Sequence, residues 1–427
     1  MMKFENSLDF AKSLDKDNPL SSYRDDFYIP ILNDKETIYF AGNGIGLQPK
    51  GVQDAVLDEL ENWASYGVIG MESGKNPWVH YSKKFPEKLA PILGAAQSEI
   101  VVMDQLTADL HLLLTSFYKP DGRRKKVLIE WKAFPSAVYA VQSHMHLAGV
   151  PLEENLVEVG TREGERYTRN EDILSAIEAA GDELALVLVS GVNYYSGQVF
   201  DMQAITDAAH KVGALCGFDL AHAVGNVPLR LHDWNVDFGV WCSYKYLNGG
   251  PGAIGGLFVH ERHFNGSPLP RLAGFFGADE KAGYQFKKDF IPKSGAAGWQ
   301  LTVPPVLSLS VLEASLELFE SAGFDNIVEG GKRLSSYLLF ILNDILKNTQ
   351  SKPFEIVTPT GEGDHGCQIS LYLGADGKHK FDMLRNNRVI ITGFPDHVVR
   401  VAPVPLYNTY EEVFLFGKIL EHILIAH

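Results

Sequence analysis

Two polar residues stand at the ends of strand-like segments and together could do carbonyl chemistry. Asp219 lies at the end of the apolar run 214–220, and Lys245 follows the next apolar run, 238–243. Ligands of open α/β sheets bind outside the carboxyl ends of the strands, so both side chains should face one crevice. A lysine there can form a Schiff base with an aldehyde, provided that its amine is partly unprotonated.

The carboxylate gives this pair a more specific chemistry. A carboxylate beside the ring nitrogen of pyridoxal keeps that nitrogen protonated, which makes the ring an electron sink for a carbanion at the substrate Cα. The pair therefore predicts an enzyme with pyridoxal 5′-phosphate (PLP) on Lys245 and Asp219 beneath the pyridine nitrogen. His222 would stack on the ring or hydrogen-bond to Asp219. Taken singly, Asp219 could cap a helix and Lys245 could lie on a solvated loop. The ordered pair with the glycine-rich tail 248–252 favours the site.

A phosphate site should accompany the aldehyde. Leu106 and Thr107 follow the apolar run 99–103 and precede a predicted helix, 108–118. Free N–H groups and the positive end of the helix dipole would hold a dianion there, with the Thr107 hydroxyl as a further donor. From this segment alone, Thr107 could equally be a simple helix cap. Three further residues with hydroxyl groups stand at strand ends or beside the lysine: Ser190, Tyr195 and Tyr244. The alternative for the two tyrosines is that they only pack against the sheet edge.

Apolar runs that alternate with helical stretches should position these residues. This alternation indicates βαβ crossovers and an α/β fold whose mostly parallel sheet is covered on both faces. The predicted strands are 38–42, 99–103, 126–131, 184–191, 214–220, 238–243 and 254–260, with helices at 172–180 and 202–212 between them.

The chain of 427 residues is too long for one hydrophobic core. The segment TVPP (302–305) interrupts the alternation, and two long helical stretches, two strand-like runs and a final helix from Glu411 follow it. We predict three parts: an N-terminal helical arm (1–38), a large PLP-binding domain (39–305) and a smaller α+β C-terminal domain (306–427).

The composition disfavours several classes of binding partner and site. The formal net charge of -15 argues against nucleic acid or an anionic membrane as the main partner. No apolar run is long enough to span a bilayer, and the N-terminus lacks the apolar core of a signal peptide. The three cysteines include no CxxC pair, so we expect buried thiols in a cytoplasmic protein, with neither a disulfide framework nor a metal site.

Several motifs resemble those of the kynureninase family over most of the chain. They are GFDLAHAVGN (217–226), CSYKYLN (242–248), LHDW (231–234), KAFPS (132–136), RVAPVPLYN (400–408), GNGIGLQPK (42–50) and GKNPW (74–78). SYKYLN alone resembles the wider class V aminotransferases, whereas RVAPVPLYN is more specific.

The resemblance implies an aspartate-aminotransferase-like fold, PLP, and a homodimer with shared active sites. It also implies hydrolysis of the Cβ–Cγ bond of kynurenine or 3-hydroxykynurenine to anthranilate or 3-hydroxyanthranilate plus alanine. That reaction belongs to tryptophan catabolism and NAD biosynthesis.

By position, Lys245 resembles the family's Schiff-base lysine and Asp219 the partner of the ring nitrogen. Tyr244 matches a position that contacts the cofactor, and because it stands beside Lys245 we expect its hydroxyl to assist proton delivery to Cβ. Arg400 resembles the arginine that binds the substrate carboxylate, although alone it could be a surface salt-bridge partner. The remaining positions match residues that contact the cofactor, with Phe134 as the stacking ring: Leu106, Thr107, Phe134, Ser136, Ala137, Ser190 and His222.

Four positions depart from the family pattern. Gly44, next to the substrate, replaces a serine, and Ala137 replaces an acidic residue. Phe275 stands where the family has tryptophan, and Val303 where it has asparagine or threonine; both belong to the set that reaches the neighbouring subunit's site. The segment 67–74 also differs in length. We therefore expect intact cofactor chemistry and an unusual substrate pocket.

Two other functions stay open at this point. The departures could mark a PLP-dependent lyase or desulfurase that acts on a different amino acid. A non-catalytic PLP-fold binding protein is the more remote alternative, because Lys245, Asp219 and Arg400 are all retained.

Overall fold

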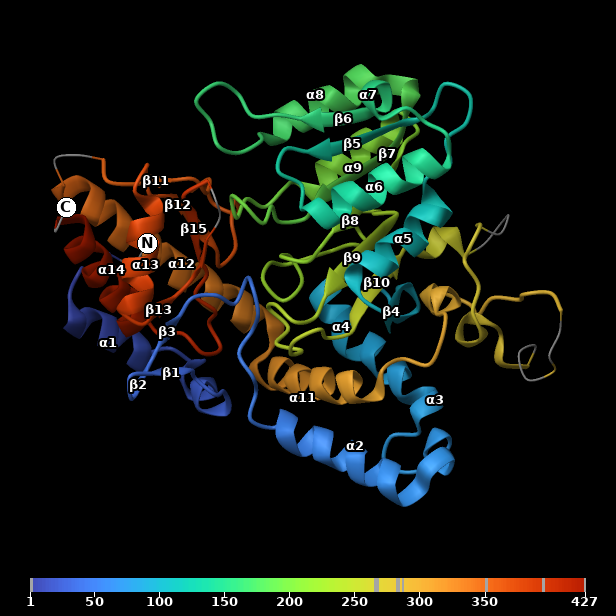
Figure 1. Ribbon diagram of the computed structural model, residues 1–427, viewed down its shortest axis with the longest axis horizontal. Coiled ribbons are helices and arrows are strands. Elements are labelled where there is room, and N and C mark those ends of the chain that lie inside the picture. Colours follow the sequence, from blue (N-terminus) through green and yellow to red (C-terminus); the bar gives the residue numbers. More distant parts are fainter. Residues whose placement is uncertain are drawn as a thin grey trace.

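The computed structural model describes residues 3–264, 269–281, 285, 288–349, 352–393 and 396–425. Figure 1 shows a large lobe built around one long sheet and a smaller lobe that contains both chain ends.

The sheet of the large lobe has seven strands in the order β4-β10-β9-β8-β7-β5-β6. Only β10 runs antiparallel to its neighbours, which confirms a mostly parallel sheet. The strands are β4 (Ile100–Met103), β5 (Lys126–Glu130), β6 (Leu156–Val159), β7 (Leu184–Ser190), β8 (Leu215–Asp219), β9 (Phe238–Cys242) and β10 (Gly255–Val259).

Helices cover both faces of this sheet, as its apolar strands require. Along β7, Val187 and Val189 face one core cluster, whereas Leu186 and Leu188 face the other. Helices α5 (Leu106–Phe117) and α6 (Pro135–Leu147) cover the second face. The first face is covered by α4 (Phe85–Leu93), α8 (Asn170–Ala180), α9 (Met202–Lys211) and α11 (Val306–Ala322).

The small lobe has an antiparallel sheet in the order β11-β12-β15-β14. Its elements are β11 (Glu355–Ile356), β12 (Ile369–Tyr372), β14 (Thr392–Gly393), β15 (Val398–Val401), α12 (Phe324–Asn348), α13 (Gly377–Asn386) and α14 (Tyr410–Ile425). One sequence prediction is wrong here. The segment 38–42 is no strand of the large sheet, because β3 (Ile38–Tyr39) pairs instead with β13 (Val389–Ile390) beside the small lobe.

The N-terminal segment is fastened to the end of the chain. Helix α1 (Leu8–Lys16) packs on α14, and Ala11 and Leu14 belong to the core of the small lobe. The Asp15 carboxylate accepts the backbone N–H groups of Tyr410 and Glu411 at 2.7 and 2.9 Å, and so caps α14.

Further elements are the long helix α2 (Val52–Tyr66) and the short β1 (Ile31–Leu32), β2 (Lys35–Glu36), α3 (Trp78–Tyr81) and α7 (Leu152–Asn155). All three cysteines are buried free thiols. In the described part of the chain, no helix is both long and apolar enough to cross a membrane.

Candidate active site

Three neighbouring parallel strands end in polar residues: β5 in Glu130, β7 in Ser190 and β8 in Asp219. Ser190 and Asp219 lie opposite each other in the ladder. At this edge lies a cavity of about 70 Å³. Its lining contains nine of the predicted residues, namely Leu106, Thr107, Phe134, Ser136, Ser190, Asp219, His222, Tyr244 and Lys245, together with Val192, Tyr194 and Ala221. The crevice expected from Asp219 and Lys245 is therefore present.

Lys245 and His222 contact each other in this cavity. The Lys245 Nζ lies 2.9 Å from His222 Nε2, and both residues are buried. Burial, followed by the charges of Lys245 and Arg400, holds the pKa of His222 well below its usual range. His222 is therefore neutral and accepts from Lys245 through Nε2. Its Nδ1 is buried without a hydrogen-bond partner among the described residues.

The turn that carries Lys245 is fixed by a close approach of the 42–50 segment. The Gly46 N–H donates to the Tyr244 carbonyl oxygen at 2.8 Å. A Cβ at position 46 would lie 2.4 Å from the Lys245 carbonyl oxygen, which no side chain can tolerate. The GNGIG motif therefore has a physical role, which is to let two loops pack backbone to backbone beneath the lysine.

Asp219 is held as a buried carboxyl group. Its Oδ1 accepts the backbone N–H of Ala221 at 2.9 Å. Burial raises the pKa of Asp219, while the Ala221 N–H and the Lys245 charge oppose that rise. A cationic group beside Asp219 would offset the cost of burying its charge.

Two helices begin at the cavity. Helix α5 starts at Leu106, two residues earlier than predicted, so Thr107 lies within its first turn and the helix-cap alternative is wrong. Helix α6 starts at Pro135 and brings Ser136 to the same cavity. The first N–H groups of a helix have no partner within it, so two such ends suit a dianionic phosphate.

Phe134 and Tyr244 provide the aromatic walls. The Phe134 ring is 42% exposed, lies edge-on to Tyr194 at 5.1 Å between centroids, and has the Lys245 Nζ 5.8 Å from its centre. Burial raises the pKa of the Tyr244 hydroxyl, so this group stays protonated and can donate.

Arg400 approaches from the small lobe and contacts the cavity residue Tyr194, but it is not among the described residues that line the cavity. It lies in β15, is only 7% exposed, and its Nη1 donates to the Tyr194 carbonyl oxygen at 3.1 Å. The surface salt-bridge alternative is therefore wrong. Burial lowers the pKa of Arg400 to about 10, so the guanidinium remains charged at neutral pH. Arg400 also acts electrostatically on His222, which lines the cavity.

The four departures lie in different surroundings. A Cβ at Gly44 would lie 2.9 Å from Thr392 Cγ2, so Thr392 occupies the space that a serine at 44 would need. Ala137 is buried in the first turn of α6. Phe275 and Val303 do not line this chain's cavity. Phe275 is 55% exposed and lines a separate hollow of about 240 Å³ with Met71, Val79 and His80.

Sequence reasoning missed two functional candidates. Tyr194 lines the cavity and anchors Arg400 through its carbonyl oxygen, but nothing in the sequence marks one tyrosine of the pair 194–195. Glu130 lies directly behind Ser190, and its Oε1 accepts the Ser190 hydroxyl at 2.5 Å. An acid at the end of the apolar strand β5 was the available signal.

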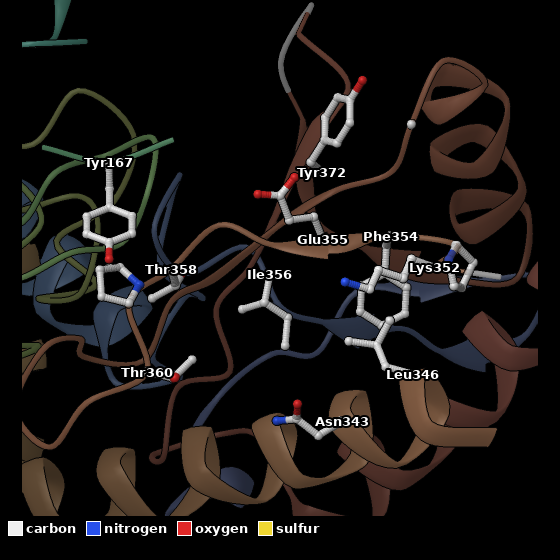
Figure 2. Close-up of a pocket in the computed structure, with 13 residues that line it drawn as sticks. Tyr167, Asn343, Leu346, Lys352, Phe354, Glu355, Ile356, Thr358, Thr360 and Tyr372 are labelled. Carbon is white, nitrogen blue, oxygen red and sulfur yellow. The ribbon is translucent and has the colours of Figure 1, made fainter. Parts of the chain in front are cut away.

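A wider hollow of about 750 Å³ lies elsewhere, at the edge of the small sheet (Figure 2). Leu346 and Asn343 of α12, Ile356 of β11 and Tyr167 of the large lobe surround it. Glu355 on its rim pairs with Arg166 at 3.1 Å. None of the predicted site residues is among the described residues that line it, so its size alone assigns it no chemistry.

One group of described residues, Glu99, His232 and His260, has spacing that could hold a metal ion. The His232 and His260 rings stack with an interplanar angle of 13°. Glu99 already accepts His232 Nδ1 at 3.0 Å and the Glu261 N–H at 2.8 Å. The arrangement instead anchors the LHDW segment.

The cavity residues fit PLP. Lys245 offers an amine, Asp219 a buried carboxylate, and the first turns of α5 and α6 bring Leu106, Thr107 and Ser136 to the cavity. The His222 ring presents a buried Nδ1 that has no partner among the described residues. These are the donors and the charge that an aldehyde, a pyridine nitrogen and a phosphate require.

Comparison with known proteins defines the class first. The Aminotransferase class-V model matches residues 38–356. The cystine C–S lyase C-DES, with glycine linked to its PLP cofactor, superposes with a TM-score of 0.75 over 90% of this chain and 96% of its own, at 16% identity. A cysteine desulfurase from Thermococcus onnurineus gives a TM-score of 0.75 over 95% and 98% of the two chains, at 18% identity. The fold is that of the class V, PLP-dependent aminotransferases.

Relatives with higher sequence identity identify the family within this class. The Kynureninase C-terminal domain model matches residues 331–420. A kynureninase of Flavobacterium johnsoniae is 48% identical over 98% of this chain and 99% of its own length. A kynureninase of Mus musculus is 42% identical over 97% and 92% of the two chains. The chain therefore belongs to the kynureninase family, as its motifs predicted.

Proposed function

We propose that this protein is a kynureninase that holds PLP on Lys245. It would cleave the Cβ–Cγ bond of kynurenine or 3-hydroxykynurenine with one water molecule, and release anthranilate or 3-hydroxyanthranilate plus alanine. The observation that supports it most is the meeting of Lys245 and Asp219 in one cavity, with Arg400 hydrogen-bonded to the cavity residue Tyr194, in a chain of this family.

The cofactor would be held from three sides. Lys245 Nζ would bind its aldehyde carbon, Asp219 would face its ring nitrogen, and the first turns of α5 and α6 would bind its phosphate. Phe134 and His222 would flank the ring, and Ser190 would bind one of its polar groups. When bound, PLP supplies an electron sink for the pair released at Cα and then from the Cβ–Cγ bond.

The protein's own groups would then bind substrate and move protons. Arg400 would bind the α-carboxylate through its guanidinium fork. Lys245 Nζ, once displaced by the substrate amine, would take the proton from Cα. The Tyr244 hydroxyl, kept protonated by burial, would deliver a proton to Cβ after the bond breaks. A water molecule would add to the γ-ketone.

We also propose a homodimer with shared sites. Helix α2 lies on the outer side of the large lobe (Figure 1). This helix and the turn after it expose five large apolar side chains: Leu57, Leu60, Trp63, Val68 and Ile69. Groups of exposed apolar side chains of this kind usually mark an interface. Phe275 and Val303 would reach the partner's cavity across it. A cytoplasmic location and a role in tryptophan catabolism and NAD biosynthesis are the further parts of this proposal.

The direct test is an assay for alanine and the aryl amine with purified, PLP-loaded protein. Both products should appear in equal amounts from kynurenine or 3-hydroxykynurenine. Sulfide or persulfide release from cysteine or cystine, without alanine from either kynurenine, would replace this function by the lyase or desulfurase alternative. Protein that binds no cofactor and releases nothing would favour the binding-protein alternative.

Arg400→Lys should raise the KM for kynurenine by about tenfold to a hundredfold. Lysine keeps the charge but loses the fork, and a hydrogen bond to a charged group contributes roughly 1.5–3 kcal/mol. The absorbance of the bound cofactor should not change, because Arg400 would contact substrate only. An altered cofactor spectrum with an unchanged KM would assign Arg400 to the cofactor instead.

The departures predict slow turnover of kynurenine despite normal cofactor binding. Each lost hydrogen bond to a buried ketone or aniline costs roughly 1–3 kcal/mol, or about one to two orders of magnitude in rate. Phe275→Trp with Val303→Asn should therefore raise kcat/KM for kynurenine or 3-hydroxykynurenine.

Leu301→Met, close to Val303 in the chain but not a departure, is the matched control for the double variant. If the wild type is already fast and the double variant gains nothing, other residues of the pocket compensate for the two departures.

A further inference from the structure

A buried acid stands directly behind the cavity. Glu130 is 1% exposed and does not line the cavity, but its Oε1 accepts both the backbone N–H of Ser190 at 3.1 Å and the Ser190 hydroxyl at 2.5 Å. Its Oε2 is buried without a hydrogen-bond partner among the described residues. Ser190 itself lines the cavity beside Asp219. Among the described residues, the Ser190 hydroxyl is therefore the hydrogen-bonding link between Glu130 and the cavity.

We propose that Glu130 is a positioning residue, whose protonation decides whether the Ser190 hydroxyl donates a hydrogen bond to the bound cofactor or accepts one. The inference rests on the proposed cofactor site and adds to it a residue that never touches the cofactor.

The reason is that a serine hydroxyl has a single proton. When Glu130 is ionised, Ser190 gives that proton to Oε1 and presents only lone pairs to the cavity. When Glu130 is protonated, its own O–H can donate to Ser190 Oγ, and the serine proton can then turn toward a ligand. One proton on Glu130 thus reverses the direction of the bond that Ser190 makes.

The surroundings of Glu130 make both states accessible. Burial, which is the largest effect, raises its pKa to about 7, the hydrogen bonds from Ser190 oppose that rise, and the charge of Asp219 on β8 adds to it. On the neighbouring strands, β7 contributes Ser190, and β6 places the apolar Val159 opposite Glu130.

Ionised oxygens of PLP need donors, so cofactor binding should favour the protonated state of Glu130. The linkage has a definite sign. If binding raises the pKa of Glu130, its contribution to affinity is complete below the pKa of the free protein, near 7. This contribution is lost as the pH rises from there through the pKa of the complex.

The test measures the dissociation constant of PLP from cofactor-free protein across the neutral and mildly alkaline range. The affinity of the wild type should fall as the pH rises, and more steeply than the affinity of Glu130→Gln. The difference between the two should reach up to about tenfold per pH unit. The amide oxygen of Gln can accept the same two hydrogen bonds but cannot titrate. Glu158→Gln is the control, because Glu158 is an exposed acid on the adjacent strand β6, and it should follow the wild type. A Glu130→Gln profile that keeps the wild-type slope would overturn the proposal.

Two further measurements keep the test decisive if Glu130→Gln folds poorly. Ser190→Ala retains Glu130 but breaks the relay, so it should lose the same extra slope, and a retained slope would refute the relay. Infrared difference spectra should show the carbonyl band of a protonated carboxyl group growing as PLP binds to the wild type. No such band would also refute it. Neither measurement uses kynurenine, so failure to cleave kynurenine would count against the proposed function alone.

Discussion

Lys245→Ala is expected to lose kynurenine cleavage by on the order of 10⁴-fold, the upper range for removing a group that transfers protons in an active site. Two losses combine in this variant. The cofactor loses its covalent attachment to Nζ, and no amine remains beside Asp219 and His222 to take the proton from Cα. The visible absorbance of the lysine-bound cofactor should disappear as well, and steady-state kinetics and spectra would measure the two effects.

Borohydride treatment of the wild type should fix the cofactor permanently on the peptide that contains Lys245. Lys126→Ala is a suitable control, because Lys126 stands at the end of β5 that is far from the cavity and pairs with Glu183. This variant should keep both its colour and its turnover. Reduced cofactor on any other lysine would refute the central assignment.

The chemistry-bearing residues could be predicted because the signal is local. A polar residue that ends an apolar strand lies at the carboxyl edge of a parallel sheet, and this placed Ser190 and Asp219 correctly. The roles given to these residues rest on the family resemblance and stay predictions.

Elements that depend on distant partners were harder to predict. β15 is short and contains the charged Arg400, so its pattern does not read as a strand until β12 pairs with it. The two residues of β3 are set by β13, far along the chain. In the sequence Glu130 is only the polar end of an apolar strand. Its proposed role depends on the hydrogen bond with Ser190, which lies on another strand.

The domain division also depends on packing. The buried side chains of α11 belong to the large core. Helix α12 begins there with Ile327 and passes into the small core from Leu334 on. The proposed boundaries at 38 and 305 stay predictions. Phe275 and Val303 do not line the cavity of their own chain. Their proposed partners belong to a second copy of the chain, which a single sequence does not place.

Asp219→Asn should keep part of its cofactor but lose turnover on the order of 10²-fold to 10³-fold, the range seen when one preorganised group that stabilises charge is removed. The amide oxygen can still accept the Ala221 N–H that Oδ1 accepts now, so the turn should survive. What disappears is the negative charge. Without it the ring nitrogen is not kept protonated, and the electron sink fails at the step where Cα loses its proton.

The matched control is Asp201→Asn, which makes the same chemical change outside the site. The Asp201 carboxylate caps α9 through the Ala204 N–H at 3.0 Å, and asparagine caps helices about as well. This variant should keep wild-type turnover and stability. A solvent-exchange assay of the substrate Cα proton would then locate the defect, because Asp219→Asn should exchange this proton far more slowly than the wild type. If Asp219→Asn exchanged it at the wild-type rate and turned over normally, another group would be the partner of the ring nitrogen.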